Sequence, residues 1–412
     1  MDINYNFTFQ PVGQGLFYTG RVGDKNFVYD CGSNNKFQLE KCISNYGEIN
    51  GAVNCIDLLI ISHFHEDHVS GLKQLLDQVT VDTVVLPYIG DVEKVYLLAR
   101  GGYGDTTSTF DLLFDPVRYF LGGKKPKARR VIFIAPGRAN GPDDIEVVVP
   151  NDNNPSIDTN QMEEDKEVKA TLKQDLFYDE CFERDKLAVF KHNKPLILSS
   201  IWIFKFFNIK VSSDALKKFQ RELKLILDFS DKTLLKRQLK EPRVRKIIAT
   251  CYEESLNKRR GDFNDTSLVL FHAPLKQYNK TGIMSVVRDF RLLNIQRIDH
   301  RDRTINDAIG QLLLGDIKLS ETNYSQFTRH FQYELQEILF ILLPHHGSKH
   351  NWNRALLKDC VNAETFISSS GFSNTYGHPS IDVVDDIITC QQEFIGGSEF
   401  VEIWVSGWTS QN

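Results

Sequence analysis

The chain has few cysteines, and they are not spaced as pairs. Seven are scattered over 412 residues without a CxxC motif. Disulfide frameworks and thiolate zinc sites both require paired or closely spaced cysteines. We therefore expect reduced thiols, as in a cytoplasmic protein, and we expect a metal site to use other side chains.

The chain also lacks a long apolar run and a secretory leader. Its most apolar segment, residues 196–207, contains Lys205 and is shorter than the roughly 20 residues that a membrane-spanning helix needs. Residues 1–6 carry neither a basic region nor an apolar stretch, as a signal peptide would. These absences predict a cytoplasmic protein that does not enter a membrane.

What the sequence does have is one dense group of metal-binding side chains. Residues 63–68 read His-Phe-His-Glu-Asp-His and follow an apolar run with the length and branched side chains of a buried strand. His63 and His65 alternate along an extended turn, so both can reach one metal ion, and Asp67 and His68 can reach a second. Zn²⁺ and Mn²⁺ accept such mixed nitrogen and oxygen ligands. The alternative is a polar loop whose histidines are merely solvated.

This group is similar to the HxHxDH signature of the metallo-β-lactamase fold, and other motifs accompany it. They are VGQG at 12–15, VYDCG at 28–32, NDTSLVL at 264–270, LLGD at 313–316, PHHGS at 344–348 and YGHP at 376–379. In this order they resemble the hydrolase domain of ComEC-type competence proteins and the stand-alone hydrolases related to it. The resemblance covers about residues 8–95 and 262–405.

The resemblance implies an α/β fold, the αββα sandwich, with a helical insertion. We expect residues 1–150 and 262–412 to form its two halves and residues 151–261 to form a mostly helical, basic insertion with a polar, flexible entry over 151–180. The basic stretch 124–130 contains a proline and is expected to be a loop, as is the glycine-rich stretch 101–109. Alternation and periodicity predict strands 5–12, 15–22, 25–30, 56–61, 83–87, 131–135, 145–149, 338–343 and, as the last, 365–369, and helices 36–45, 71–78, 92–99 and 110–121.

The insertion carries most of the positive charge. Residues 217–260 contain 14 Lys or Arg and 6 Asp or Glu, a net charge of +8 in a chain whose total is −5. A phosphate-backbone substrate favours such a surface, and an ordinary solvated helix surface explains it equally well. Phe219, Phe229 and Tyr252 recur at helical spacing, so we expect them to pack in a core rather than to stack on bases.

By the resemblance, Asp316 bridges two divalent ions, Zn or Mn; an Asp that caps the next helix is the alternative. Adjacent side chains at a strand end point to opposite sides, so we expect only one of His345 and His346 to face the metals. His378 lies at the same rim. Asp67, His346 and His378 are the expected catalytic residues. The expected metal ligands are His63, His65, Asp67, His68, Asp316, His346 and His378.

Other residues are expected to support the site or to touch the substrate. Asp30 ends a strand and is expected to hydrogen-bond the metal-binding loop, since metal-bound imidazoles usually donate their second N–H to an oxygen; a simple turn Asp is the alternative. His345, Ser348, Asn264 and Tyr376 are further candidates. His272 follows the strand at 268–271 and is better explained as a structural residue.

Two departures from the wider family bear on the site. A further metal-binding histidine is usual between the hexad and the bridging Asp, whereas this chain has Asn264 and its neighbours there. Competence proteins usually have Asp after VGQG, whereas this chain has Leu16. The first departure leaves the occupancy of the first metal position open, and the second leaves a contact of this loop with phosphate or metal open.

The expected chemistry is hydrolysis by water that two metal ions activate. We expect a phosphodiesterase or nuclease with nucleic acid, first single-stranded or looped DNA, as substrate. The alternatives are a small-molecule phosphodiesterase or ester hydrolase, or a catalytically weak metal-binding module that acts with a partner protein docked on the helical insertion.

Overall fold

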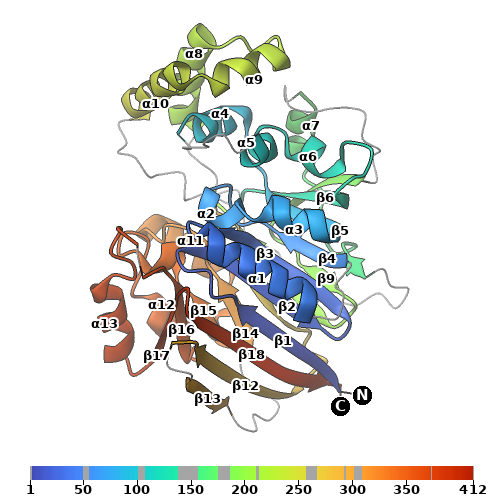
Figure 1. Ribbon diagram of the computed structural model, residues 1–412, viewed down its shortest axis with the longest axis vertical. Coiled ribbons are helices and arrows are strands. Elements are labelled where there is room, and N and C mark those ends of the chain that lie inside the picture. The colour runs from blue at the N-terminus through green and yellow to red at the C-terminus, as the bar shows by residue number, and fades with distance from the viewer. Residues whose placement is uncertain are drawn as a thin grey trace.

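The computed structural model describes residues 2–49, 55–100, 107–137, 156–174, 186–209, 213–256, 267–291, 294–300, 309–372 and 374–411. Two β-sheets pack face to face, and helices cover the outer face of each (Figure 1). The fold is therefore the predicted αββα sandwich.

The first sheet has ten strands in the order β13-β12-β18-β1-β2-β3-β4-β5-β6-β8. Their bounds are β1 (Ile3–Phe9), β2 (Gly15–Val22), β3 (Lys25–Ser33), β4 (Cys55–Ile60), β5 (Thr80–Pro87), β6 (Ala128–Ala135), β8 (Leu187–Lys191), β12 (Lys280–Asp289), β13 (Asn294–His300) and β18 (Val401–Ser410). Strands β3 to β6 and β8 run parallel, whereas the remaining pairs are antiparallel.

The second sheet has eight strands in the order β17-β16-β15-β14-β11-β10-β9-β7. Their bounds are β7 (Ile157–Asp158), β9 (Leu196–Leu198), β10 (Trp202–Phe207), β11 (Val269–Pro274), β14 (Gly310–Leu313), β15 (Ile338–Leu342), β16 (Thr365–Ser369) and β17 (Glu393–Gly397). Strands β14 to β17 are parallel, so their carboxyl ends lie at one edge of the sheet.

Three apolar layers hold the sandwich together. The middle layer lies between the sheets and includes Phe7, Phe27 and Phe204. The outer layers lie under the helices of each sheet. The helices are α1 (Lys36–Ile49), α2 (Glu66–Val69), α3 (Leu72–Gln78), α4 (Asp91–Arg100), α5 (Thr107–Phe114), α6 (Pro116–Leu121), α7 (Lys166–Gln174), α8 (Ser213–Ile226), α9 (Lys232–Lys240), α10 (Pro242–Leu256), α11 (Glu321–His330), α12 (Leu356–Asp359) and α13 (Ile381–Thr389), with single 3-10 turns η3 (Leu335–Glu337) and η4 (Pro344–Gly347).

Helices α8, α9 and α10 form a group that packs on α4 at the top of Figure 1. Phe219 and Tyr252 are buried there, and the ring of Tyr252 lies 3.6 Å from that of Tyr96 on α4. Phe229 packs against the same layer, so the expected core role of these three aromatics is confirmed. Residues 156–209, in contrast, contribute strands to both sheets. The domain boundaries at 150 and 261 remain predictions.

Three local predictions were wrong. The helix expected over 110–121 is two helices, because Pro116 cannot continue α5. The Asp115 side chain instead begins α6 by accepting a hydrogen bond from the Arg118 N–H. The loop expected over 124–130 ends early, since β6 begins at Ala128. The strand at 365–369 is not the last, because β17 and β18 follow it. The strand expected at 145–149 lies outside the described residues, as do most of the loop expected at 101–109 and parts of the segment 151–180.

No helix in the described part of the chain combines the length and the apolar character needed to cross a bilayer. The cysteines that the structure describes are free thiols.

Candidate metal centre

Four strand ends bring the candidate side chains together. β4 leads into the His63–His68 stretch and α2, and β14 leads through Gly315 to Asp316. β15 leads into the two histidines of η4, and β16 ends at Ser369. Gly315 is needed at its turn, because its φ is +52° and an added Cβ would lie 2.6 Å from the Ser267 hydroxyl. The sandwich therefore builds one site from both sheets.

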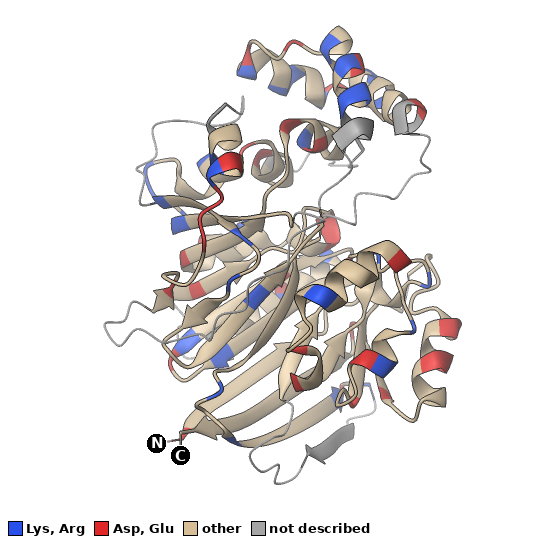
Figure 2. Ribbon diagram, turned by 180° about the vertical axis from the view of Figure 1, so that it is seen from behind, with Lys and Arg blue, Asp and Glu red and all other residues tan. Residues whose placement is uncertain are grey.

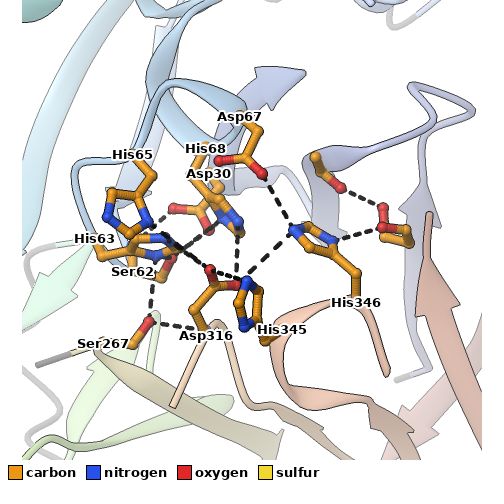
Figure 3. A network of polar contacts seen from close by, with 12 residues as sticks. Asp30, Ser62, His63, His65, Asp67, His68, Ser267, Asp316, His345 and His346 are labelled. Carbon is orange, nitrogen blue, oxygen red and sulfur yellow. Dashed lines mark hydrogen bonds and ion pairs between the residues drawn. The ribbon is translucent and has the colours of Figure 1, made fainter. Parts of the chain in front are cut away.

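Asp316 lies at the middle of the cluster, and its two carboxylate oxygens face different histidines (Figure 3). Oδ2 lies 3.3 Å from His63 Nε2 and 3.9 Å from His65 Nδ1. Oδ1 lies 3.3 Å from His68 Nε2. A carboxylate that reaches two groups of imidazoles has the arrangement expected of a bridging ligand.

Asp67 lies above Asp316 and pairs with His346. Their Oδ2 and Nε2 atoms are 3.2 Å apart. The other ring nitrogen of His346, Nδ1, donates to the carbonyl oxygen of Ser369 at 2.6 Å. This bond fixes the ring so that Nε2 faces Asp67 and, at 4.0 Å, Asp316 Oδ1.

Asp30 lies behind the cluster and is completely buried. Its Oδ1 accepts from the Ser62 backbone N–H at 2.7 Å, and its Oδ2 accepts from the Ser62 hydroxyl at 2.5 Å and from His68 Nδ1 at 2.7 Å. His68 thus donates a hydrogen bond from Nδ1 to Asp30, and its Nε2 points at Asp316. This is the arrangement expected for a carboxylate that orients a metal ligand from behind.

Both His345 and His346 approach Asp316, and the expectation that only one of them faces the metals remains a prediction. His345 Nε2 lies 3.6 Å from Asp316 Oδ2, and its Nδ1 contacts Asn351 Oδ1 at 3.1 Å. The strand has ended before these residues, and both have left-handed backbone angles, with φ of 46° and 58°. The alternation of an extended chain therefore does not apply to them.

Three polar residues of the site were not predicted. The Ser62 hydroxyl contacts His63 Nδ1 at 2.8 Å, and the Ser267 hydroxyl contacts the same nitrogen at 3.2 Å while accepting from the Asp316 backbone N–H. Asn351 donates to the Asp316 carbonyl oxygen at 2.8 Å. Ser62 and Ser267 stand beside motifs that the sequence did reveal, whereas no sequence signal marks Asn351.

Three buried polar atoms at the centre make no hydrogen bond to the residues that the structure describes: His63 Nε2, His68 Nε2 and Asp316 Oδ1. Buried polar atoms are costly unless they have a partner. Each of these atoms can coordinate a cation, and the nearby sets His63–His65–Asp67 and Asp67–His68–His346 each place their ligand atoms within 4.8 Å of one another. The donor set is imidazole nitrogen with carboxylate oxygen, which fits divalent ions of the zinc and manganese type.

The protonation of the cluster agrees with this interpretation. Burial and the neighbouring His68 lower the pKa of His63 to about 4, so this ring is neutral at pH 7. Burial alone would raise the pKa of Asp67, but His68 and His346 hold it well below its usual range. Asp316 is likewise kept ionised against its burial, by His345, His63 and His68. Neutral imidazoles and ionised carboxylates are the forms that bind metals.

His68 behaves differently from His63. Burial alone would lower its pKa, but the carboxylates of Asp316, Asp30 and Asp67 raise it well above its usual value. The negative charge around His68 thus favours a cation at its Nε2, whether a proton or a metal ion.

His378 lies at the rim, beside the cluster rather than in it. Its ring centre is 5.4 Å from that of His345 and 6.0 Å from that of Tyr376. Burial and the two histidines of η4 lower its pKa to about 4, and its buried Nδ1 makes no hydrogen bond. No contact brings it to Asp316 or Asp67, so its role as a ligand remains a prediction.

The other candidates are placed less centrally. Tyr376 is exposed, and Ser348 is buried with its N–H bonded to the His345 carbonyl oxygen. Leu16 is buried in the apolar layer between the sheets, so the position after Gly15 has a core role in this chain. Asn264 lies outside the described residues.

The chain resembles known proteins in part of its length. The family model of the metallo-beta-lactamase superfamily matches residues 12–153. No curated protein gives a significant match. One similar solved structure is the metallo-beta-lactamase fold protein YhfI from Bacillus subtilis, with 10% sequence identity and a TM-score of 0.36; the match covers 96% of this chain and 98% of that chain. Another is a long form RNase Z from yeast, with 11% identity and a TM-score of 0.32; the match covers 82% of this chain and 32% of that chain.

Proposed function

We propose that this chain is a metal-dependent hydrolase that cleaves phosphodiesters, with nucleic acid as its substrate. The match of residues 12–153 to the metallo-beta-lactamase superfamily supports the hydrolase class. The observation that carries the metal dependence is the set of buried, unbonded atoms at the centre: two imidazole nitrogens and one carboxylate oxygen that face one another. A metal ion between them would be a shared partner for all three atoms.

We assign the candidate ligands to two ions. His63 and His65 would hold one, and Asp67, His68 and His346 would hold the other, with Asp316 shared between them. When bound, divalent ions at such a site lower the pKa of water and neutralise charge that develops on substrate oxygens. Zn²⁺ and Mn²⁺ are the proposed ions.

The protein's own groups have separate tasks in this proposal. Asp67 is ionised at neutral pH and can accept a hydrogen bond from the attacking water, so it orients the nucleophile. Asp30 and the Ser369 carbonyl oxygen hold the rings of His68 and His346 by their second nitrogens. His378 is neutral near pH 7, so its ring N–H can donate to a substrate oxygen at the rim.

Positive charge on the helical group supports a phosphodiester substrate. Lys and Arg are frequent on α8, α9 and α10, as Figure 2 shows at the top of the molecule. Part of this charge is neutralised locally, since Lys232 pairs with Asp115 at 2.6 Å and Lys236 pairs with Asp111 at 2.8 Å. The remaining basic side chains of these helices supply the long-range attraction for a polyanion.

The test is incubation of the purified protein with labelled single-stranded DNA, double-stranded DNA and RNA in the presence of Mn²⁺, Zn²⁺ or EDTA. We expect cleavage that EDTA abolishes and that Asp316→Asn loses. Hydrolysis of bis-p-nitrophenyl phosphate without cleavage of any nucleic acid would instead indicate a small-molecule phosphodiesterase.

Metal analysis separates the enzyme from a catalytically weak binding module. We expect up to two divalent ions per chain and a melting temperature that falls in EDTA, because ions that bind only the folded chain stabilise it. Fewer than about one ion per chain, with the same melting temperature in EDTA, would favour a module that works with a partner protein.

A further inference from the structure

A cavity of about 460 Å³ lies on the outer face of the first sheet, between α1 and strands β1, β2 and β18. We call it the amide cleft. In Figure 1 this face lies in front, where α1 runs alongside β1 and β2. Its volume is in the range of small-molecule sites, roughly 300–1,000 Å³, and none of the candidate metal ligands lines it.

Five carboxamides contribute to the polar lining of the amide cleft. They come from β1 and the residue after it, the start of β3, and α1, and are Asn6, Gln10, Asn26, Gln38 and Asn45. A carboxamide offers both donors and an acceptor, as the edge of a nucleobase does. The charged lining residues are Arg21, Lys41, Glu399 and Glu402, and their formal charges cancel. The lining therefore suits an uncharged polar group better than a phosphate.

Aromatic rings form the wall on the side of β12 and β18. Trp404, Phe400 and Phe290 line the amide cleft there, and Phe400 and Phe290 are each 41% exposed. Bases of single-stranded nucleic acid are commonly bound by stacking on aromatic side chains together with hydrogen bonds to their edges. The amide cleft holds both kinds of group.

The aromatic wall continues to the rim of the metal centre. The rings of Phe400 and Phe372 lie 5.8 Å apart, and the Arg291 guanidinium lies 4.4 Å from the Phe372 ring and 5.4 Å from the Phe400 ring. Arg291 is also paired with Asp289. Phe372 is three residues from Ser369, at most about 10 Å along an extended chain, and the Ser369 carbonyl oxygen holds His346.

A second connection runs through the glycine loop before β2. The Glu399 carboxylate lies against Gly13, where a Cβ would come within 2.6 Å of it, and accepts from the Phe372 N–H at 2.9 Å. Two residues on, a Cβ at Gly15 would lie 2.5 Å from the Asp67 carbonyl oxygen. One wall of the amide cleft is thus built on the loop that contacts the Asp67 backbone.

We propose that the amide cleft binds a nucleobase of a single-stranded substrate whose phosphodiester lies at the metal centre. This inference rests on the proposed phosphodiesterase function and adds the recognition of the base. The neutral, carboxamide-rich lining argues for the base rather than the backbone, and the aromatic wall provides the surface on which it stacks.

The first experiment measures binding without catalysis. The full-length protein in EDTA is titrated calorimetrically with adenosine 5′-monophosphate, uridine 5′-monophosphate and ribose 5-phosphate. We expect the nucleotides to bind and the sugar phosphate not to bind. Trp404→Leu and Gln38→Leu should each weaken nucleotide binding about 10-fold, the size expected for the loss of one base contact. Equal binding of ribose 5-phosphate would overturn the base assignment, and so would the absence of nucleotide binding.

Matched controls use the same substitutions outside the amide cleft. Trp408→Leu changes a tryptophan of the same strand, β18, and Gln220→Leu changes an exposed glutamine on α8; neither residue lines the cleft. Both variants should bind nucleotides as the wild type does. Equal weakening in Trp404→Leu and Trp408→Leu would overturn the proposal, and melting curves identify a variant that is unfolded.

The second experiment measures turnover. Trp404→Leu should raise the KM for a single-stranded oligonucleotide about 10-fold, with little change in kcat, and leave the hydrolysis of bis-p-nitrophenyl phosphate unaltered. If both substrates are affected equally, the cleft does not read the base. If no phosphodiester is hydrolysed at all, the proposed function fails, while the binding measurement in EDTA still decides whether the cleft takes a nucleobase.

Discussion

The buried His272 differs from the buried histidines of the metal centre in the hydrogen bonds that its ring nitrogens make. His272 lies between the sheets, with the Phe7 and Phe27 rings against it. Its Nδ1 accepts from the Trp202 indole N–H at 3.0 Å, so its Nε2 carries the proton and donates to the Tyr18 hydroxyl at 2.9 Å. Tyr18 in turn donates to Gln311 Oε1 at 2.8 Å.

His63 and His68 at the metal centre are buried as well, but one nitrogen of each ring makes no hydrogen bond to a described residue. His63 and His68 each use Nδ1 in a hydrogen bond, while Nε2 faces Asp316 without one. Among the described residues, no carboxylate contacts His272, whereas His63 and His68 both lie beside one. Burial by itself therefore does not identify a ligand. An imidazole nitrogen without a hydrogen bond and directed at a carboxylate is a better criterion for a candidate ligand, because a cation between the two groups would complete the pair.

The largest expected loss of activity is at Asp67, rather than at the residues that support the candidate ligands from behind. Asp67→Ala should lower kcat by at least about 10³-fold, since it removes a group used in the transition state, and should leave the melting temperature nearly unchanged. Activity at saturating metal is the measurement. An Asp67→Ala enzyme that keeps most of its activity would contradict the proposed role.

A smaller effect is expected at Asp30, which touches the candidate ligand His68 from behind. Asp30→Ala should weaken metal affinity roughly 10- to 100-fold, and excess metal should restore part of the activity. Activity is measured against metal concentration for this variant and for Asp67→Ala. If Asp30→Ala stays inactive at saturating metal while Asp67→Ala works, the two roles are exchanged.

The pH dependence of stability should report on His272. Burial lowers its pKa from 6.5 to about 3, so between these values the unfolded chain binds a proton that the folded chain does not. Its stabilisation is complete above pH 6.5 and is lost as the pH falls toward 3, by up to about 1.4 kcal/mol per pH unit. His272→Gln should remove this slope, as denaturant unfolding at pH 7, 6 and 5 can show. The same slope in both proteins would mean that His272 titrates normally.

The smallest expected effect is on the melting temperature. Added Zn²⁺ should raise the melting temperature of the wild type by a few degrees, because it binds only the folded chain. His272→Gln should keep this rise and Asp30→Ala should need more metal to reach it. A loss of the rise in His272→Gln would link the core network to the metal centre.

Sequence reasoning succeeded where the signal is local. The alternation in residues 6–34 and the apolar run before His63 predicted β1 to β4, and the motifs and their family resemblance brought Asp30, Asp67 and Asp316 under consideration. Long-range strand pairings left no local signal. The segment from Leu196 to Phe207 lies within the region predicted as a mostly helical insertion, whose bounds remain a prediction, and its β10 pairs with β11, more than sixty residues later in the chain.

The supporting residues of the site show the same limit. Ser62, Ser267 and Asn351 matter because of the atoms that folding places beside them, and serine and asparagine are too common in loops to mark a site. The left-handed turn at His345 and His346 was also not visible, because only glycine signals such a backbone reliably from sequence.

The pairing of β1 with β18 joins Ile3 to Thr409 and Phe9 to Ile403, so the two ends of this chain meet in one sheet. The centre spans a similar interval, from Asp30 through Asp316 to His346. Ribosomes add roughly 5–20 residues per second, and tens of seconds therefore pass between the emergence of the first histidines and that of the shared carboxylate. Until then the nascent chain holds only four of the seven candidate ligands, so the candidate metal centre can be completed only after residue 316 has emerged.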